Sequence, residues 1–255
     1  MVQILDIPPK QADAVNCEIG PSKFCPGCGH GITLNTLGFA IDELELKERS
    51  VFGCDIGCSL LAWNFMSVDS VQTHHGRTTP VIYGITRAVP GTVGIAYMGD
   101  GGGYAIGAQH LVNAATRNEK MMVLLVNNTN YGMTGGQMAP TTLPGQKTET
   151  TPYGRDIEAH GKPFLGPEMV ASITDEKLNY VARGSVNNLR QLKTFLKRAL
   201  TNVADGRGFS FVEVLSLCPL NWRTNNVDTW ERLKEMESFY KVGELKVPEE
   251  VKGVK

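Results

Sequence analysis

The pattern that most constrains the fold is a pair of short apolar runs joined by a glycine loop and a helix-like segment. TVGIAYM (92–98) is followed by the loop GDGGG (99–103), and MMVLLV (121–126) is continuously apolar. Such a run is typical of a strand buried on both faces. The segment 104–120 between them has helical spacing, and its apolar side is expected to carry Ile106, Leu111, Ala114 and Ala115. This order predicts a βαβ unit with two parallel strands.

The rest of the chain repeats the alternation. Strands are expected within 50–57, 178–186 and 209–215, with helices at 78–90, ending before Pro90, and at 187–204. The fold class is therefore α/β, with a doubly wound, mostly parallel sheet. We expect one domain over residues 1–220 and a C-terminal arm over 221–255. The polar segment 131–156 has little periodicity, and loops of that length are usually functional or mobile.

Composition excludes several classes of protein. The chain has 255 residues and a formal net charge of −1, which does not suggest a nucleic-acid or membrane-surface partner. No apolar run reaches the roughly 18–20 residues of a membrane span. The first residues lack the basic and apolar regions of a signal peptide, so we expect a cytoplasmic protein. In that compartment the six cysteines are expected to be thiols, metal ligands or catalytic groups.

Polar residues follow the two strands of the βαβ unit. Asp100 lies in the glycine loop, where a carboxylate repels a phosphate, and Asn127 and Asn128 follow the next strand. Ligands of parallel sheets bind at the carboxyl ends of the strands, and carboxylate and amide oxygens suit Mg²⁺. The glycines 101–103 leave room for a metal-bound phosphate. The alternative is a glycine-rich turn with an Asx cap and no ligand. Neither a dinucleotide-binding fingerprint nor a P-loop fits the spacing.

The cysteines lie in separate places. FCPGCGHG supplies Cys25 and Cys28, FGCDIGCS supplies Cys54 and Cys58, and Cys218 lies far along the chain. Three sites remain open from the residues alone: structural zinc, a dithiol redox pair and an iron–sulfur cluster. Zinc usually draws on two close cysteine pairs, and Gly-His-Gly is an unusual helix start for a redox pair.

Taken together, GDG, a helix, a strand and NN resemble the thiamine diphosphate motif. The segment NNTNYGMTGGQMAPTT resembles the β subunit of the 2-oxoacid:ferredoxin oxidoreductases. The resemblance covers about residues 25–222 of the chain. The resemblance implies a thiamine diphosphate-binding type of sheet, and Mg²⁺ held by Asp100, Asn128 and the backbone carbonyl of Asn130. In much of that family a second aspartate follows GDG, where this chain has Gly102.

The resemblance also implies a [4Fe–4S] cluster. Its ligands map to Cys25, Cys28, Cys58 and Cys218, with Cys54 an ambiguous neighbour and Cys17 a bystander.

The residues expected to bind the cofactor form a larger set: Gly29, His30, Ile56, Gly57, Cys58, Ser59, His75, Gly99, Asp100, Gly101, Gly102, Asn128, Asn130, Tyr131, Gly132, Met133 and Thr134. His75 and Arg77 resemble the family's His-Gly-Arg and are expected to be catalytic, near the diphosphate or the substrate carboxylate. The alternative for this segment is a solvated loop. We assign no chemistry to His110, and we expect His160 on the surface.

The implied reaction is the oxidative decarboxylation of a 2-oxoacid. The acyl group passes to coenzyme A, and the electrons pass through the cluster to ferredoxin. No glutamate lies in a motif suited to activating the aminopyrimidine ring, so the family implies a partner α subunit, and γ or δ subunits are further partners. Two other classes stay open: a non-redox decarboxylase subunit with a structural zinc, and a subunit that only relays electrons.

The substrate is predicted from the flanks of the site. SLLAWNF (59–65) and TGG (134–136) offer no Lys or Arg for the distal carboxylate of 2-oxoglutarate. Leu60, Leu61 and Trp63 are candidates for an apolar pocket, with a helix core face as the alternative. We therefore favour a branched-chain 2-oxoacid over 2-oxoglutarate or pyruvate.

Overall fold

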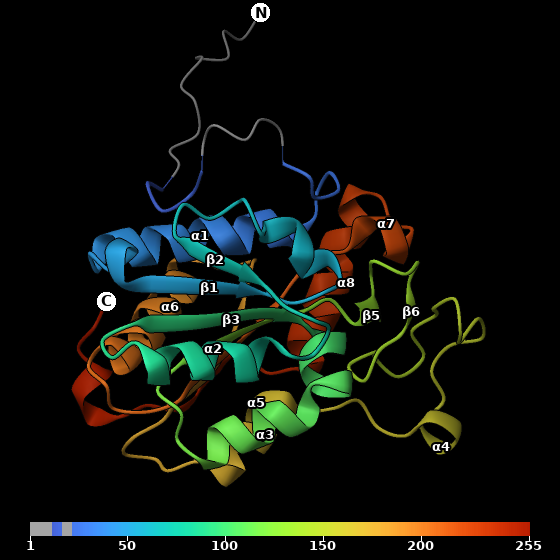
Figure 1. Ribbon diagram of the computed structural model, residues 1–255. Helices are drawn as coiled ribbons and strands as arrows, with labels where there is room; N and C mark the ends of the chain where they lie inside the picture. Colours follow the sequence, from blue (N-terminus) through green and yellow to red (C-terminus); the bar gives the residue numbers. More distant parts are fainter. Residues whose placement is uncertain (1–11, 17–21) are drawn as a thin grey trace, which may run out of the picture.

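A seven-stranded sheet forms the centre of the molecule (Figure 1). The computed structural model describes residues 12–16 and 22–255. The strand order is β2-β1-β3-β4-β8-β7-β9, and every neighbouring pair is parallel except β7 and β9. The strands of this sheet are β1 (Ser50–Cys54), β2 (Asp69–Gln72), β3 (Val93–Gly99), β4 (Met122–Asn127), β7 (Tyr180–Ser185), β8 (Ser210–Leu215) and β9 (Gly243–Lys246).

Helices cover both faces of the sheet. The helices are α1 (Gly29–Glu43), α2 (Thr78–Ala88), α3 (Ala108–Thr116), α4 (Ile157–His160), α5 (Gly166–Ile173), α6 (Leu189–Ala204), α7 (Pro219–Trp222) and α8 (Asn226–Phe239). Figure 1 shows α1 above the sheet and α2 and α3 below it. The predicted doubly wound, mostly parallel α/β fold is confirmed.

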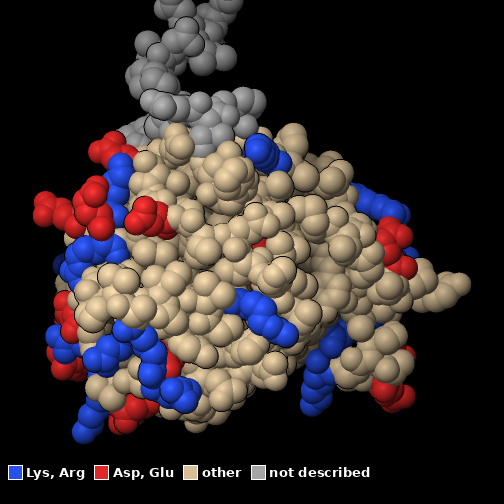
Figure 2. Space-filling model, viewed as in Figure 1, with Lys and Arg blue, Asp and Glu red and all other residues tan. Residues whose placement is uncertain are grey.

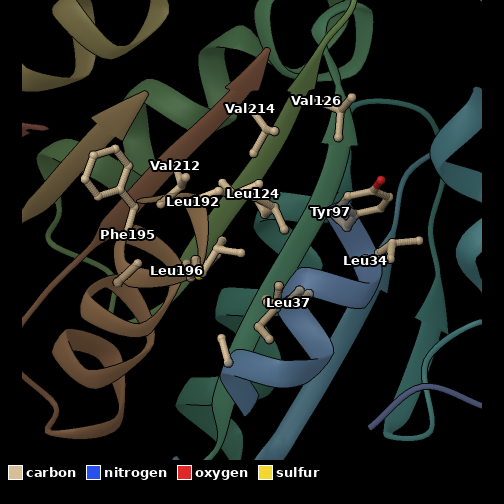
Figure 3. Packing of buried hydrophobic residues seen from close by; sticks show 14 of the residues in the cluster. Leu34, Leu37, Tyr97, Leu124, Val126, Leu192, Phe195, Leu196, Val212 and Val214 are labelled. Carbon is tan, nitrogen blue, oxygen red and sulfur yellow. The ribbon is translucent and has the colours of Figure 1, made fainter. Parts of the chain in front are cut away.

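Two apolar clusters form the core, one on each face. Leu124 and Val126 of β4 point to the face covered by α1 and α6, and Figure 3 shows them in one cluster with Leu37 and Leu196. Their neighbour Leu125 points to the opposite cluster, beside residues of α2, α3 and α5. Successive side chains of a strand alternate between faces, so a strand covered on both sides is apolar at every position. This is why MMVLLV has no polar residue.

The strands and helices expected from the sequence are present, with one correction. The segment 104–120 is not one helix. A π-helical turn (Gly102–Ile106) precedes α3, and the two are separated by Gly107, which packs closely against the backbone of Gly76. Ile106 therefore does not share the buried side with Leu111: it is 49% exposed, whereas Leu111 is fully buried. Single π turns inside helices often occur at functional sites.

The C-terminal segment adds to the same sheet. Beyond residue 220, α8 buries Leu233 and Met236 in the core cluster under α1 and α6, and β9 pairs antiparallel with β7. The antiparallel pair β5 (Asn130–Tyr131) and β6 (Gln137–Met138) lies at the start of the long segment 131–156. Its end is held by Arg155, whose guanidinium donates to the carbonyls of Pro140 and Thr142. Among the described helices, none combines the length and apolar character that crossing a membrane requires.

Candidate functional site

A cavity of about 340 Å³ opens at the carboxyl ends of the central strands. The loops that follow β1, β3 and β4 form its walls, because parallel strands end at one edge of the sheet. Its lining residues are His30, Ile56, Gly57, Cys58, Ser59, His75, Gly99, Asp100, Gly101, Gly102, Ala105, Ile106, Asn128, Asn130, Tyr131, Gly132, Met133 and Thr134. The structure thus brings together every residue expected to bind the cofactor except Gly29.

Asp100 is a buried carboxylate, and the groups that hydrogen-bond to it are neutral. Its Oδ1 accepts from the backbone N–H of Gly101 at 2.8 Å, and its Oδ2 accepts from the Thr141 hydroxyl at 2.8 Å. No ion pair to Asp100 occurs within the part of the chain that the structure describes. Burial raises the pKa of Asp100 from 3.8 to about 7. A buried carboxylate without a cation is costly, so the site fits a bound metal ion.

The two asparagines after β4 have different tasks. Asn127 Oδ1 accepts from the backbone N–H of Thr129 at 3.1 Å, and Thr129 has a left-handed backbone with φ of 58°. This Asx turn bends the chain so that Asn128 and Asn130 both line the cavity. The indole Nε1–H of Trp222 donates to the Asn128 carbonyl at 3.0 Å and fixes the turn from outside. Asn127 therefore shapes the loop, and the next asparagine, Asn128, lines the cavity together with Asp100.

Four cysteines interact electrostatically with one another. Cys58, which lines the cavity, interacts with Cys25, Cys28 and Cys218, whereas Cys54 interacts with Asp55 and with none of these four. Burial raises the pKa of Cys28 to about 11 and that of Cys58 to about 12, so metal binding has to release their protons. In the described residues no three His, Cys, Asp or Glu side chains are placed to hold a single metal ion.

The four cysteines lie next to the loop that follows β4 and carries Asn130 and Gly132. Cys218 contacts the side chain of Asn130, with Sγ 3.8 Å from Oδ1, and Asn221 donates both to Cys218 Sγ and to the Gly132 carbonyl. The cysteine group and the cavity therefore share a wall. Helix α1 begins at Gly29, directly after Cys28, so Gly-His-Gly opens a helix here although it is an unusual start for one. Cys17 lies outside the described residues.

His30 is the buried histidine of the cavity. It is 2% exposed, its ring stacks on Phe24, and its Nδ1 lies 2.5 Å from the Tyr97 hydroxyl. Burial lowers its pKa to about 4, so the ring is neutral near pH 7. It is held rigidly between the cysteine group and the cavity.

His75 lines the cavity, while Arg77 does not. His75 Nδ1 lies 3.0 Å from Asp55 Oδ2, and Arg77 donates to the Ile106 carbonyl at 3.4 Å. Gly29 also lies outside the lining. A side chain there would overlap with Ser216, so Gly29 allows close packing of α1.

Ala105 and Ile106 line the cavity although the sequence did not predict them, and three residues that support the site from outside the lining were not expected either. Asp55 follows β1 directly, as Asp100 follows β3, and the same strand-end argument applies to it. Thr141 and Trp222 act on the site from the long loop and from α7, and no local pattern marks them. The candidates for the substrate pocket are absent from the lining: Leu61 packs against the core, and Trp63 is exposed.

Comparisons with known proteins identify relatives of the chain. Residues 55–214 match the family described as thiamine pyrophosphate enzyme, C-terminal TPP binding domain. The ketoisovalerate oxidoreductase subunit VorA of Methanothermobacter marburgensis is 44% identical over 83% of this chain and 45% of its own length. The chain thus spans about half of that relative. The 2-oxoglutarate synthase subunit KorB of Archaeoglobus fulgidus is 35% identical over 88% of this chain and 80% of its own length.

One solved structure extends the likeness to three dimensions. The 2-oxoglutarate:ferredoxin oxidoreductase from Magnetococcus marinus, with 2-oxoglutarate, coenzyme A and succinyl-CoA bound, superposes with a TM-score of 0.73 at 28% identity. The match covers 88% of this chain and 76% of that one.

Proposed function

This chain belongs to the family of 2-oxoacid:ferredoxin oxidoreductase subunits with a thiamine pyrophosphate-binding domain, and from that premise we propose its reaction. The complete enzyme oxidatively decarboxylates a 2-oxoacid, passes the acyl group to coenzyme A and delivers the electrons to ferredoxin. The observation that carries the proposal is the cavity in which Asp100, Asn128 and Asn130 meet beside Cys58.

The cofactor is proposed to bind through Mg²⁺. Asp100 offers a carboxylate oxygen, and Asn128 and Asn130 offer amide or carbonyl oxygens, which is the hard donor set that Mg²⁺ prefers. With Mg²⁺ bound there, the buried charge of Asp100 would be balanced, and the site would accept a diphosphate that the carboxylate alone would repel. When bound, thiamine diphosphate supplies the nucleophilic carbon and the electron sink that loss of CO₂ requires. His30, neutral and fixed by Tyr97, is proposed to orient the cofactor from the cluster side.

The four interacting cysteines are proposed as ligands of a [4Fe–4S] cluster. A zinc ion needs its sulfurs at about 2.3 Å from one point, and no such compact group occurs in the described residues. A cluster of four irons holds its thiolates further apart than a single zinc ion does. This wider spacing suits four cysteines that interact electrostatically but form no compact group. Because Cys58 also lines the cavity, electrons would leave the substrate site over a short path.

A partner subunit is proposed to complete the site. The lining of the cavity includes no glutamate, and Lys, Arg and acidic residues are sparse over the middle of the face seen in Figure 2, where most of the charges gather towards one side. Depletion of charged residues is typical of the centre of a protein interface. An α subunit covering this edge would supply the carboxylate that activates the aminopyrimidine ring, and further γ or δ subunits would extend the assembly. Ferredoxin would dock on the cluster side.

For the substrate we favour a branched-chain 2-oxoacid. The cavity lining contains neither lysine nor arginine, so this chain offers no cation for a second carboxylate. The VorA relative, named for ketoisovalerate, is also more similar in sequence than the KorB relative. The second candidate is 2-oxoglutarate, because the partner subunit is able to supply the missing cation.

The experiment is anaerobic purification of the complex through a tag on this chain. Iron, sulfide and thiamine diphosphate are measured, and turnover is followed with a viologen acceptor in the presence of coenzyme A. We expect about four irons per chain from this site, a stoichiometric cofactor and a higher kcat/KM for 2-oxoisovalerate than for 2-oxoglutarate. Zinc in place of iron, or release of an aldehyde by decarboxylation without reduction of the acceptor, would contradict the redox assignment. A preference for 2-oxoglutarate would contradict only the substrate.

A further inference from the structure

Asp55 is a buried carboxylate beside the cavity that the proposed reaction does not yet use. It follows β1 and is fully buried. Its Oδ1 accepts from the backbone N–H of Gly76 at 2.6 Å and from the Thr78 hydroxyl at 3.2 Å. Its Oδ2 lies 3.0 Å from His75 Nδ1. The two oxygens thus have different partners, and only one of them faces the histidine.

These contacts fix the histidine ring. A carboxylate only accepts hydrogen bonds when ionised, so His75 Nδ1 has to carry a proton. The neutral ring then has its unprotonated nitrogen at Nε2, the one ring nitrogen left for a ligand. His75 itself lines the cavity, while its side chain remains 43% exposed. A carboxylate that holds one nitrogen of a histidine sets both the tautomer and the orientation of the ring.

The neighbouring backbone makes room for this pair. A Cβ at Gly102 would overlap with Asp55 Oδ2, and a Cβ at Gly76 would overlap with Ile106 and Gly107. Gly76 also has a left-handed backbone with φ of 71°. The π-helical turn and the loop after β2 therefore approach each other only because both positions lack a side chain. Glycine at these two positions costs conformational entropy on folding, and in return Asp55 is able to contact His75.

We propose that Asp55 is a positioning residue that holds His75 in the Nδ1–H tautomer, so that Nε2 is presented to the cavity as a hydrogen-bond acceptor for the bound substrate or cofactor. Asp55 acts through His75 and does not itself contact the ligand. The effect on turnover rests on the proposed function, whereas the tautomer does not.

Asp55→Asn is a near-isosteric test with a defined outcome. The Gly76 N–H is a donor only, so the amide oxygen has to take the Oδ1 position and the amide nitrogen has to face His75. The histidine must then accept at Nδ1 and carry its proton on Nε2. Long-range ¹⁵N–¹H spectra of the full chain, labelled at histidine, distinguish the two tautomers. His75→Gln identifies the resonance, and His74→Gln, an exposed neighbour outside the cavity, is the matched control.

The second measurement is a double-mutant cycle in the assembled enzyme. We expect Asp55→Asn to lower kcat/KM by about tenfold to a hundredfold, as the loss of a group behind a functional histidine typically does. His75→Gln and the double variant should fall by the same factor, because residues that act as a unit are not additive. Asp69→Asn, on the exposed side of β2, and Gly84→Ala, which has open space for a Cβ, should be unchanged. Gly102→Ala should displace the carboxylate and reproduce the tautomer of Asp55→Asn.

Each result decides the inference. A wild-type His75 with its proton on Nε2 overturns it without any variant, even if Asp55→Asn does not fold. Additive losses in the cycle also overturn it, since Asp55 and His75 would then act independently of each other. If the wild-type complex has no oxidoreductase activity, the proposed function fails, and the tautomer still tests the pair.

Discussion

Replacing Asp100 by asparagine should stabilise the empty chain and abolish its response to the cofactor. The carboxylate is buried, and its hydrogen-bond donors are backbone N–H groups and a threonine hydroxyl, all neutral. Burial raises its pKa from 3.8 to about 7, so the ionised form is disfavoured as long as no metal is bound. An amide of the same shape does not ionise. It still accepts from Gly101, and the Thr141 hydroxyl is able to turn and accept from the amide N–H.

The sign and size of the effect follow from proton linkage. The folded pKa lies above the unfolded value of about 3.9, so the folded chain binds more protons between about pH 4 and pH 7. The free energy of unfolding therefore falls as pH rises through this window, and it stays low above it. The two pKa values differ by about 3, which at about 1.4 kcal/mol per pH unit gives an upper bound of roughly 4 kcal/mol at pH 8.

Urea unfolding of the metal-free chain at pH 4 and pH 8 measures this directly. Wild type and Asp100→Asn should be similar at pH 4, and the variant should be the more stable protein at pH 8. Adding Mg²⁺ and thiamine diphosphate at a hundred times the dissociation constant should stabilise wild type by about 2.7 kcal/mol and leave the variant unchanged. Asp69→Asn, which alters an exposed carboxylate, is the control.

Two results would refute the reasoning. If the variant is less stable than wild type at pH 8, Asp100 has a favourable partner in the empty chain, and the argument from an uncompensated charge is wrong. If the variant is still stabilised by the cofactor, Asp100 does not hold the metal. The first result would not contradict the metal site, and the second would not contradict the argument that the charge of Asp100 is uncompensated.

Three further outcomes are expected. Cys58→Ser should remove most of the iron of the purified chain, whereas Cys54→Ser, outside the group of interacting cysteines, should keep it; iron analysis with the reverse result would exchange their roles. Trp222→Phe keeps an aromatic side chain but removes the indole N–H that donates to the Asn128 carbonyl, so calorimetry should show cofactor affinity about fivefold weaker. Arg183→Ala leaves two carboxylates without their shared cation and should lower the free energy of unfolding by about 3–5 kcal/mol; a loss below about 1 kcal/mol in urea would contradict this.

The central strands were predictable because burial on both faces leaves a strong signal. In β4 every residue from Met122 to Val126 is apolar, and so short and continuous a run is typical of a strand covered on both faces. Asp100 and Asn128 were predictable for a second reason: their position after parallel strands places them at one edge. The same argument applies to Asp55, but the signal there is weaker, because its strand is less apolar and ends in a cysteine motif.

Other elements depend on tertiary contacts that a local pattern does not contain. Strand β9 is half-buried at the edge of the sheet and reads GELK, with two charged residues, because an edge strand tolerates charge. Helix α1 begins with Gly-His-Gly, since Gly29 has to pack against Ser216 and His30 has to reach Tyr97. Packing at these positions overrides helix propensity.

The two aspartates at the strand ends show how the same residue type in the same topological place takes different roles. Burial raises the pKa of both carboxyl groups. Asp55 is compensated within the chain, by hydrogen bonds from a backbone N–H, a hydroxyl and the ring of His75. The donors to Asp100 are neutral groups, among them the Gly101 N–H and the Thr141 hydroxyl, and the residue lines the cavity. Under the proposed function, the uncompensated carboxylate is the one whose charge a metal ion would balance, and the compensated one is free to orient a neighbour. We therefore propose that hydrogen-bond partners, more than position, decide which strand-end acid binds the cofactor.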